Sequence, residues 1–463
     1  MTDDETPSVA LVVLDTLRAD RFEEHFDWLP GETVEHAWST SHWTVPAHAS
    51  LFTGQYAGEL GVHSLNPHLH GEFPTLAERL RDSGYNTVGF SCNPHLSPEF
   101  GFTRGFDELR RNWVGRRLDR DIYPWGEFIS NKRFDGPLRY PEALYRLLTS
   151  EHSLRKSLVD GIRRKLNHTS LDLPDRYQDH GAQAVLSDVR DRNWDDDRPT
   201  FYFANLMEAH IPYNPPVEYQ TDGVDNGGYS FATLIKRENF DPETTRRAYD
   251  DCVRYLSDVY REIFSELQSQ FDYVITVSDH GEHLGEDGMW GHNFGVAPPL
   301  TNIPLHVAGE RNLAIGDAPA SLLDVHATVL DLAGCDTDTR GTSLFEPRHN
   351  EAEERRLVEY HGICNKPTDE RLREAGVDNE TIRTYNSRYC GVALPDGYYG
   401  YETPTGFIPK YEDLKPLFKE LIDEDYDEAG YTEQFSFRCD AWIAKLNRVI
   451  DWYQKMDPNT PTQ

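Results

Sequence analysis

The chain has 463 residues and a formal net charge of −33 at pH 7, and these two numbers exclude several classes of protein. A chain of this length can form one large domain with a smaller one beside it. Its acidic surface repels nucleic acid and anionic lipid, so we expect neither as a partner. The acidic residues are spread along the chain, which favours a halophilic source, because concentrated salt screens such self-repulsion.

The six cysteines and the N-terminus indicate where the protein works. The cysteines form neither CxxC pairs nor a compact framework, which argues against structural zinc and against a disulfide scaffold. The acidic N-terminus leads into an apolar run that is too short for a signal peptide. No apolar run approaches the ~18 residues of a membrane span. We therefore expect a soluble protein with a cytoplasmic localisation.

The first apolar run, residues 9–14, predicts a strand that is buried on both faces of a parallel sheet. It ends at Asp15. Ligands of open α/β sheets bind beyond the carboxyl ends of strands, so Asp15 is a candidate ligand. The alternative is that Asp15 caps the helix that follows.

Residues 41–54 predict a hydroxyl side chain at the start of a helix. Thr44 is a favoured N-cap residue, Pro46 fits a first turn, and Gly54 can end the helix. The N-terminus of such a helix attracts anions. Thr44 is therefore either a simple helix cap or a reactive group beside an anionic substrate.

An alternation of helices and strands continues along the chain. Residues 74–84 have helical spacing closed by glycine, and residues 86–91 predict a strand that is followed by Asn93 and His95. This alternation is typical of a doubly wound sheet.

The pattern loosens over about residues 112–197, where we predict a variable insertion. Its locally basic piece, residues 154–165, suits either a lid that recognises substrate or a solvated amphipathic helix.

The second half of the chain carries the strongest chemical signal. An apolar strand over residues 200–206 precedes His210, and a long helix is expected over residues 246–268. The next strand, residues 273–278, ends directly at Asp279 and His280. Two adjacent residues that can bind a metal, at the end of a buried strand, favour a metal site over a purely structural role.

The C-terminal part changes character beyond about residue 355. A helix over residues 322–334 is followed by short strands at 357–360 and 388–394, a hairpin at 395–400 and a helix near 440–454. This pattern predicts a small α+β subdomain over residues 356–463, packed on a catalytic domain of residues 1–355.

Four stretches together resemble the sulfatase family of the alkaline phosphatase superfamily. They are VLDTLRAD at 13–20, TVPAH at 44–48, EAHIPY at 208–213 and SDHGE at 278–282. The resemblance implies an α/β fold, an α/β/α sandwich around a mixed, mostly parallel sheet, with a metal ion at the strand ends.

The nucleophile stretch departs from the family pattern. The family has Cys or Ser where this chain has Thr44, and it oxidises that residue to formylglycine; its following Ser and Arg are here Ala47 and His48. Threonine cannot give an aldehyde by that route. Relatives that transfer or hydrolyse phosphoryl groups use an unmodified threonine, so the resemblance still implies a nucleophilic Thr44.

The metal ligands implied by the resemblance are Asp15, Thr44, Asp279 and His280. Sulfatases hold calcium with an Asp-Asn pair, whereas this chain has Asp-His. Because imidazole is a poor ligand for calcium, we expect one divalent metal ion, with Mn or Zn favoured over Ca or Mg.

The resemblance also implies roles for further polar residues. His210 matches the histidine near the leaving group, and His292 stands where sulfatases carry a substrate-binding lysine. Asn93 and His95 fall on a Lys-x-His pair, and with His48 they are expected to contact substrate.

We therefore expect a metal-dependent hydrolase of phosphate or sulfate esters, with phosphodiester or phosphonate substrates favoured. The substrate is a small molecule, or an ester on a glycan or lipid headgroup. Two alternatives use the same site: a transferase of phosphoglycerol or phosphoethanolamine type, and a true sulfuric ester hydrolase. A relative that only binds its ligand is the third alternative.

Overall fold

The computed structural model describes most of residues 6–364 and part of the chain that follows them. The residues described are 6–111, 139–149, 154, 157, 180–194, 197–221, 241–336, 339–348, 355–364, 372–373, 376–395, 397–404 and 406–408. Most of the basic stretch 154–165 and the helix expected near 440–454 lie outside these residues.

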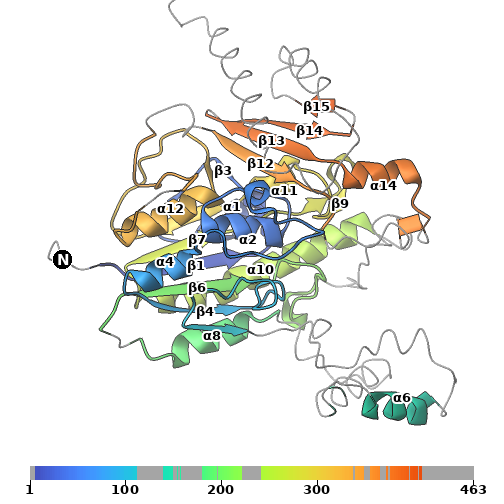
Figure 1. Ribbon diagram of the computed structural model, residues 1–463, viewed down its shortest axis with the longest axis horizontal. Helices are drawn as coiled ribbons and strands as arrows, with labels where there is room; N and C mark the ends of the chain where they lie inside the picture. Colours follow the sequence, from blue (N-terminus) through green and yellow to red (C-terminus); the bar gives the residue numbers. More distant parts are fainter. Residues whose placement is uncertain are drawn as a thin grey trace, which may run out of the picture.

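A seven-stranded sheet forms the centre of the molecule, with the strand order β2-β10-β7-β1-β6-β4-β5 (Figure 1). Strand β10 runs antiparallel to β7 and to β2, while the pairs from β7 through β5 are parallel. The expectation of a mixed, mostly parallel sheet is thereby confirmed. The strands are β1 (Val9–Leu14), β2 (Glu32–Thr33), β4 (Asn86–Ser91), β5 (Glu108–Arg111), β6 (Thr200–Leu206), β7 (Tyr273–Val277) and β10 (Leu305–Ala308).

Helices cover both faces of this sheet, because the side chains of β1 alternate between two cores. Val9, Leu11 and Val13 pack in the core beneath α2, α4 and α12. The intervening residues of β1 pack in the core shared with α1, α8 and α10. Figure 1 shows α2, α4 and α12 on one side of the sheet and α8 and α10 on the other. The helices are α1 (Ala19–His25), α2 (Thr44–Thr53), α4 (Leu76–Asp82), α8 (Ala182–Asp191), α10 (Pro242–Gln268) and α12 (Leu322–Leu332).

Helix α8 lies inside the range 112–197 that the sequence assigns to an insertion. Its buried residues Val185, Leu186 and Val189 belong to the core shared with α10. Residues 182–191 are therefore part of the helix layer of the large domain. Another helix in that range, α6 (Arg139–Leu148), is also described.

Helix α2 begins one position earlier than the sequence suggests, so the expected cap at Thr44 is wrong. The N-cap is Trp43, whose backbone is extended, and Thr44 is the first helical residue. The predicted stop is confirmed, since Gly54 takes the left-handed conformation, with φ 67°, that favours glycine. The hydroxyl of Thr44 consequently does not cap the helix.

A second sheet of four antiparallel strands, β12-β13-β14-β15, packs against the large domain. Tyr399 of this sheet stacks on Trp38 with ring centroids 3.9 Å apart. Ser41 forms a parallel bridge with Glu359 and donates its hydroxyl hydrogen to the Glu359 carbonyl at 2.7 Å. The elements are β12 (Arg356–Tyr360), α14 (Asn379–Asn386), β13 (Tyr389–Leu394), β14 (Tyr398–Thr403) and β15 (Gly406–Ile408).

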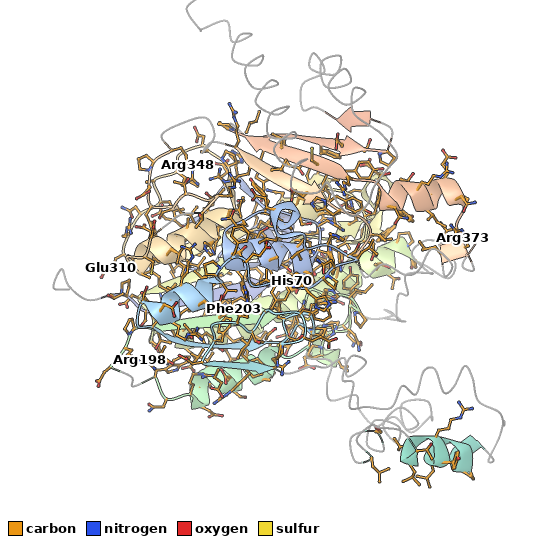
Figure 2. The ribbon with its side chains drawn as sticks, in the orientation of Figure 1. His70, Arg198, Phe203, Glu310, Arg348 and Arg373 are labelled. Atoms are coloured by element: carbon orange, nitrogen blue, oxygen red, sulfur yellow. The ribbon has the colours of Figure 1, made fainter. Side chains whose placement is uncertain are left out.

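Phe203, labelled in Figure 2, lies on β6 of the central sheet. No helix among the described residues has both the length and the apolar character that crossing a bilayer requires. The short elements are β3 (Ala37–Trp38), α3 (Ala57–Leu60), β8 (His283–Leu284), β9 (Trp290–Gly291), α11 (Pro298–Thr301), β11 (Ala320–Ser321) and two 3₁₀ turns, Val217–Tyr219 and Glu286–Gly288.

Candidate active site

Two neighbouring strands bring three metal-competent side chains together. Asp15 follows β1, and Asp279 and His280 follow β7, whose parallel register pairs Val13 with Val277. The three ligand atoms lie within 4.8 Å of one another, and all three side chains are fully buried. Nε2 of His280 is 3.8 Å from Oδ1 of Asp15 and 3.6 Å from Oδ2 of Asp279.

This Asp/Asp/His cluster fits a divalent cation. Oδ2 of Asp279 is buried without a hydrogen-bond partner; Nδ1 of His48 lies 3.4 Å from it but makes its closer contact, 3.1 Å, with the carbonyl of Thr44. Nδ1 of His280 faces the Gly281 carbonyl at 2.9 Å, which leaves Nε2 with a lone pair toward the carboxylates. Two buried acids that face an imidazole nitrogen with a lone pair are costly without a cation, and divalent metals accept this donor set.

Neighbouring histidines keep the buried carboxyl group of Asp279 ionised. Burial by itself would raise the pKa of its carboxyl group, but His280 and His48 outweigh that effect and hold the pKa below its ordinary value. The carboxylate is therefore ionised at neutral pH.

The hydroxyl of Thr44 stands at the edge of this cluster. Its Oγ1 is 3.5 Å from Nε2 of His280 and accepts a hydrogen bond of 3.2 Å from Nδ2 of Asn93. The same Nδ2 donates to Oδ2 of Asp15 at 2.7 Å, and Oδ1 of Asn93 accepts from the backbone of His95 at 2.9 Å. Asn93 thus fixes the nucleophile candidate relative to a ligand carboxylate.

Two histidines from different loops meet on the other side of His280. The ring of His292 is centred 4.7 Å from that of His280 and 4.9 Å from that of His210. Nδ1 of His292 lies 3.1 Å from Oε1 of Glu282, and the hydroxyl of Tyr213 donates to Oε2 of Glu282 at 2.7 Å.

The environments of this pair push the two pKa values apart. Burial opposes the charged form of His292, yet Glu282 more than compensates and raises its pKa. Burial, followed by the charge of His292, lowers the pKa of His210 to about 4. One member suits a proton donor and the other a proton acceptor.

The two remaining histidines predicted at the site occupy different environments. His48 is fully buried, and its ring meets those of Phe52 and Phe203 edge-on at 5.9 and 6.1 Å. His95 is half-buried, with its ring edge-on to Trp43 at 5.9 Å. The structure therefore places His48 on the core side of Thr44 and His95 on a partly exposed side.

Sequence reasoning missed several residues that contact the site. Glu282 lies inside the SDHGE stretch, and Asn205 is a polar residue in the apolar run 200–206, with Nδ2 at 3.4 Å from Oδ2 of Asp15. Thr16 follows Asp15 directly and has a positive φ of 65°. His42 is fully buried, its Nε2 has no hydrogen-bond partner, and burial followed by nearby histidines holds its pKa well below the ordinary value.

A model of the Sulfatase family matches residues 28–335. The chain therefore belongs to the sulfatase family, within the alkaline phosphatase superfamily, and the expectation of an ester hydrolase of this family is confirmed. Enzymes of this family use a divalent metal ion, which agrees with the donor set of the Asp/Asp/His cluster.

Particular relatives include both sulfatases and phosphonate hydrolases. Choline-sulfatase of Rhizobium meliloti (strain 1021) is 25% identical over 400 residues, which cover 76% of this chain and 74% of that protein. The solved phosphonate monoester hydrolase of Agrobacterium radiobacter is 17% identical, covers 96% of both chains and superposes with a TM-score of 0.59. The solved 2-O GAG sulfatase BT1596 is 14% identical, and the match covers 98% of this chain and 94% of that protein with a TM-score of 0.60. These two structural likenesses show the fold.

A second similarity, which the sequence analysis did not foresee, concerns the C-terminal part. The model of the phosphoenolpyruvate carboxykinase C-terminal P-loop domain matches residues 394–463. The GTP-dependent phosphoenolpyruvate carboxykinase of Pyrococcus horikoshii is 44% identical over 62 residues, and this chain spans about a tenth of its length. The matched range has no G-x-x-x-x-G-K-S/T sequence, and its described strands β14 and β15 extend the small sheet.

Proposed function

We propose that this sulfatase-family hydrolase cleaves phosphodiesters or phosphonate monoesters with Thr44 as its covalent nucleophile. One observation carries the proposal: a buried hydroxyl with no capping bond lies 3.5 Å from Nε2 of His280, at the edge of the Asp/Asp/His cluster. Threonine is a secondary alcohol, so its oxidation cannot yield the aldehyde of formylglycine. The group available for attack is therefore the hydroxyl itself.

The metal site of the proposal consists of Asp15, Thr44, Asp279 and His280. A divalent ion bound there supplies Lewis-acid stabilisation of the negative charge on the ester oxygens and lowers the pKa of a coordinated hydroxyl. The imidazole ligand favours Mn or Zn over Ca or Mg. Asn93 holds Asp15 and Thr44 through hydrogen bonds of its amide, and His48 contacts the carbonyl of Thr44.

The protein groups then divide the work over two steps. Neutral His210 takes the proton of the Thr44 hydroxyl, Oγ1 attacks phosphorus, the bond to the leaving alcohol breaks, and protonated His292 gives that alcohol its proton. In the second step His292, now neutral, takes a proton from water, the water oxygen attacks phosphorus, the bond to Thr44 breaks, and His210 returns its proton to Oγ1. The pKa values of the two histidines support this assignment, since the pKa of His292 is raised and that of His210 is lowered. We assign substrate contact to His95, because it is partly exposed.

A sulfuric ester is the second candidate substrate. The similarity to choline-sulfatase, which extends over 76% of this chain, favours it. The same threonine and histidines would act, with sulfur in place of phosphorus. A small molecule, or an ester on a glycan or lipid headgroup, fits either candidate.

The nucleophile is tested by substituting Thr44 and a matched threonine of the same helix. Thr44→Ala should remove turnover by orders of magnitude, because it deletes the covalent route, while Thr44→Ser should keep part of it. Thr53→Ala is the control, since Thr53 is also buried in α2 and bonds only to the backbone of its own end of the helix, at Ala49 and Gln55. Full activity of Thr44→Ala would refute the proposal.

Two further measurements complete the test. Intact-mass spectrometry of the wild type after brief reaction should show a phosphoryl or sulfo adduct that maps to Thr44. One purified batch, assayed on aryl sulfates, phosphodiesters and phosphonate monoesters, decides the ester class, and a preference for sulfate would select the second candidate. Product that forms only when an acceptor alcohol is added would indicate a transferase.

A further inference from the structure

The turn that follows β1 has an unusual backbone. Thr16 adopts φ 65°, and among the described residues only Asp287 shares a positive φ without being glycine. A β-branched side chain disfavours this region, so surrounding contacts must hold the turn in place.

The left-handed conformation lets Thr16 contact both acids of the Asp/Asp/His cluster. Its hydroxyl donates to Oδ1 of Asp15 at 2.8 Å, and its backbone N–H donates to Oδ1 of Asp279 at 3.3 Å. One residue thus sets the orientation of two carboxylates that come from different strands. Oδ2 of Asp279 has no hydrogen-bond partner, which leaves it available to a cation.

The hydroxyl of Tyr249, on α10, holds this turn from the opposite layer. It donates to the carbonyl of Thr16 at 2.9 Å and accepts from the backbone N–H of Arg18 at 3.0 Å. Tyr249 is fully buried. Burial raises the pKa of its phenol, so the hydroxyl keeps the proton that it donates.

A second contact ties the same turn to β7. The N–H of Leu17 donates to Oγ of Ser278 at 3.1 Å, and that hydroxyl donates to the carbonyl of His280 at 2.7 Å. Tyr249 and Ser278 therefore clamp the turn on both sides, yet neither has a contact with a ligand atom of the cluster.

We propose that Tyr249 is a positioning residue of the metal site: its hydroxyl pins the turn Thr16–Arg18, and Thr16 then presents Asp15 and Asp279 to a single cation. The proposal rests on the metal site of the proposed function and is independent of whether Thr44 is the nucleophile. Residues that hydrogen-bond directly to metal ligands, as Thr16 does, change metal affinity about 10- to 100-fold when substituted, and Tyr249 acts on the ligands through Thr16.

The test is a titration of metal-free Tyr249→Phe with Mn²⁺ or Zn²⁺, followed by a competing chelating dye. The dissociation constant should rise about 10- to 100-fold relative to wild type. Turnover measured at saturating metal should recover toward the wild-type kcat, because Tyr249 does not contact the ester.

Tyr260→Phe is the matched control. Tyr260 is a fully buried tyrosine of the same helix, and its hydroxyl bonds to Oγ1 of Thr276, inside β7 and before the ligands. Its removal should leave metal affinity unchanged. Thr16→Ser keeps the hydroxyl and should retain most of the affinity, while Thr16→Val should lose it to the same degree as Tyr249→Phe.

The outcomes separate this proposal from the proposed function. Wild-type affinity in Tyr249→Phe, or an equal loss in Tyr260→Phe, would overturn the positioning role. Failure of the wild type to bind either metal would instead remove the metal site on which the proposed function depends, and the positioning role with it. Loss of turnover in Thr44→Ala bears on the nucleophile alone.

Discussion

Asp279 and Asp324 are both fully buried acids, but their surroundings differ in kind. Asp324 lies in the first turn of α12, where Arg348 (Figure 2) lies 3.1 Å from its Oδ1 and Arg356 bonds to both of its oxygens. The backbone N–H groups of Ser321 and Thr342 also donate to it, at 2.6 and 2.9 Å.

Asp279 has a second acid, Asp15, as its neighbour, and no arginine or lysine pairs with it among the ion pairs of the described chain. The comparison teaches how to distinguish two kinds of buried charge. A carboxylate whose oxygens are fully bonded to cations and N–H groups stabilises the fold, whereas one with a free oxygen beside another acid is prepared for an external cation.

The largest expected effect is on catalysis, and it comes from a substitution in the Asp/Asp/His cluster. Asp279→Asn should abolish stoichiometric binding of Mn or Zn and reduce turnover by orders of magnitude, because the cluster loses a ligand. The metal-free variant should be less stable than metal-free wild type, because the contacts that lower the pKa of Asp279 favour its charged form in the folded state. Elemental analysis and urea denaturation measure the two effects. Full occupancy in the variant, or calcium alone in an active wild type, would contradict the assignment.

Asp324→Asn should produce a different pattern. Removing this acid leaves the guanidinium groups of Arg348 and Arg356 buried without their partner, which costs about 3–5 kcal/mol of unfolding free energy. The metal dissociation constant should stay at its wild-type value. Urea unfolding of the metal-free protein gives the free energy of unfolding, and competition with a chelating dye gives the metal dissociation constant. A stable variant with weakened metal binding would mean that the two sites are coupled.

Metal removal sharpens the same distinction. Metal at 100 times its dissociation constant should stabilise the wild type by about 2.7 kcal/mol, since only the folded state assembles the cluster. Differential scanning calorimetry with and without chelator detects this shift. Mn²⁺ or Zn²⁺ should raise the melting temperature more than Ca²⁺ does, and Asp279→Asn should show no shift with any of them.

The smallest expected effect is a pH dependence that arises at Asp324. Burial would raise its pKa, but Arg356 and Arg348 outweigh burial and lower the pKa below the ordinary 3.8. A group with a depressed pKa in the folded state stabilises the protein above its unfolded pKa, and this contribution is lost as the pH falls through the folded value. The melting temperature of the metal-free protein should therefore fall below about pH 4. In Asp324→Asn the melting temperature should depend less steeply on pH in this acidic range. An unchanged dependence would mean that other acids cause it.

Much of the central sheet could be predicted from local pattern. The apolar runs at 9–14 and 200–206 became β1 and β6 with the same bounds, because strands covered on both faces favour apolar residues, and the strand predicted over 86–91 became β4. Asp15 and the Asp279-His280 pair are predicted as candidate ligands because they follow the carboxyl ends of the buried strands β1 and β7. A cytoplasmic localisation and a halophilic source remain predictions from composition.

The error at Thr44 shows where local pattern stops. Threonine is a good N-cap, and nothing in residues 41–54 says that Trp43 takes that position instead. Ser41, just before this turn, forms a bridge with Glu359, more than 300 residues away along the chain. A contact over that sequence distance cannot be recognised in the local pattern.

The sequence by itself determined which residue types end the buried strands, and hence the family and the kind of chemistry. Only the tertiary structure decided that Tyr249 supports Thr16, that Glu282 raises the pKa of His292, and that His48 faces the core. The physical reason is that these contacts depend on the register of parallel strands and on how α10 lies across the sheet. Those quantities are set by packing over the whole core, and no periodicity along the chain encodes them.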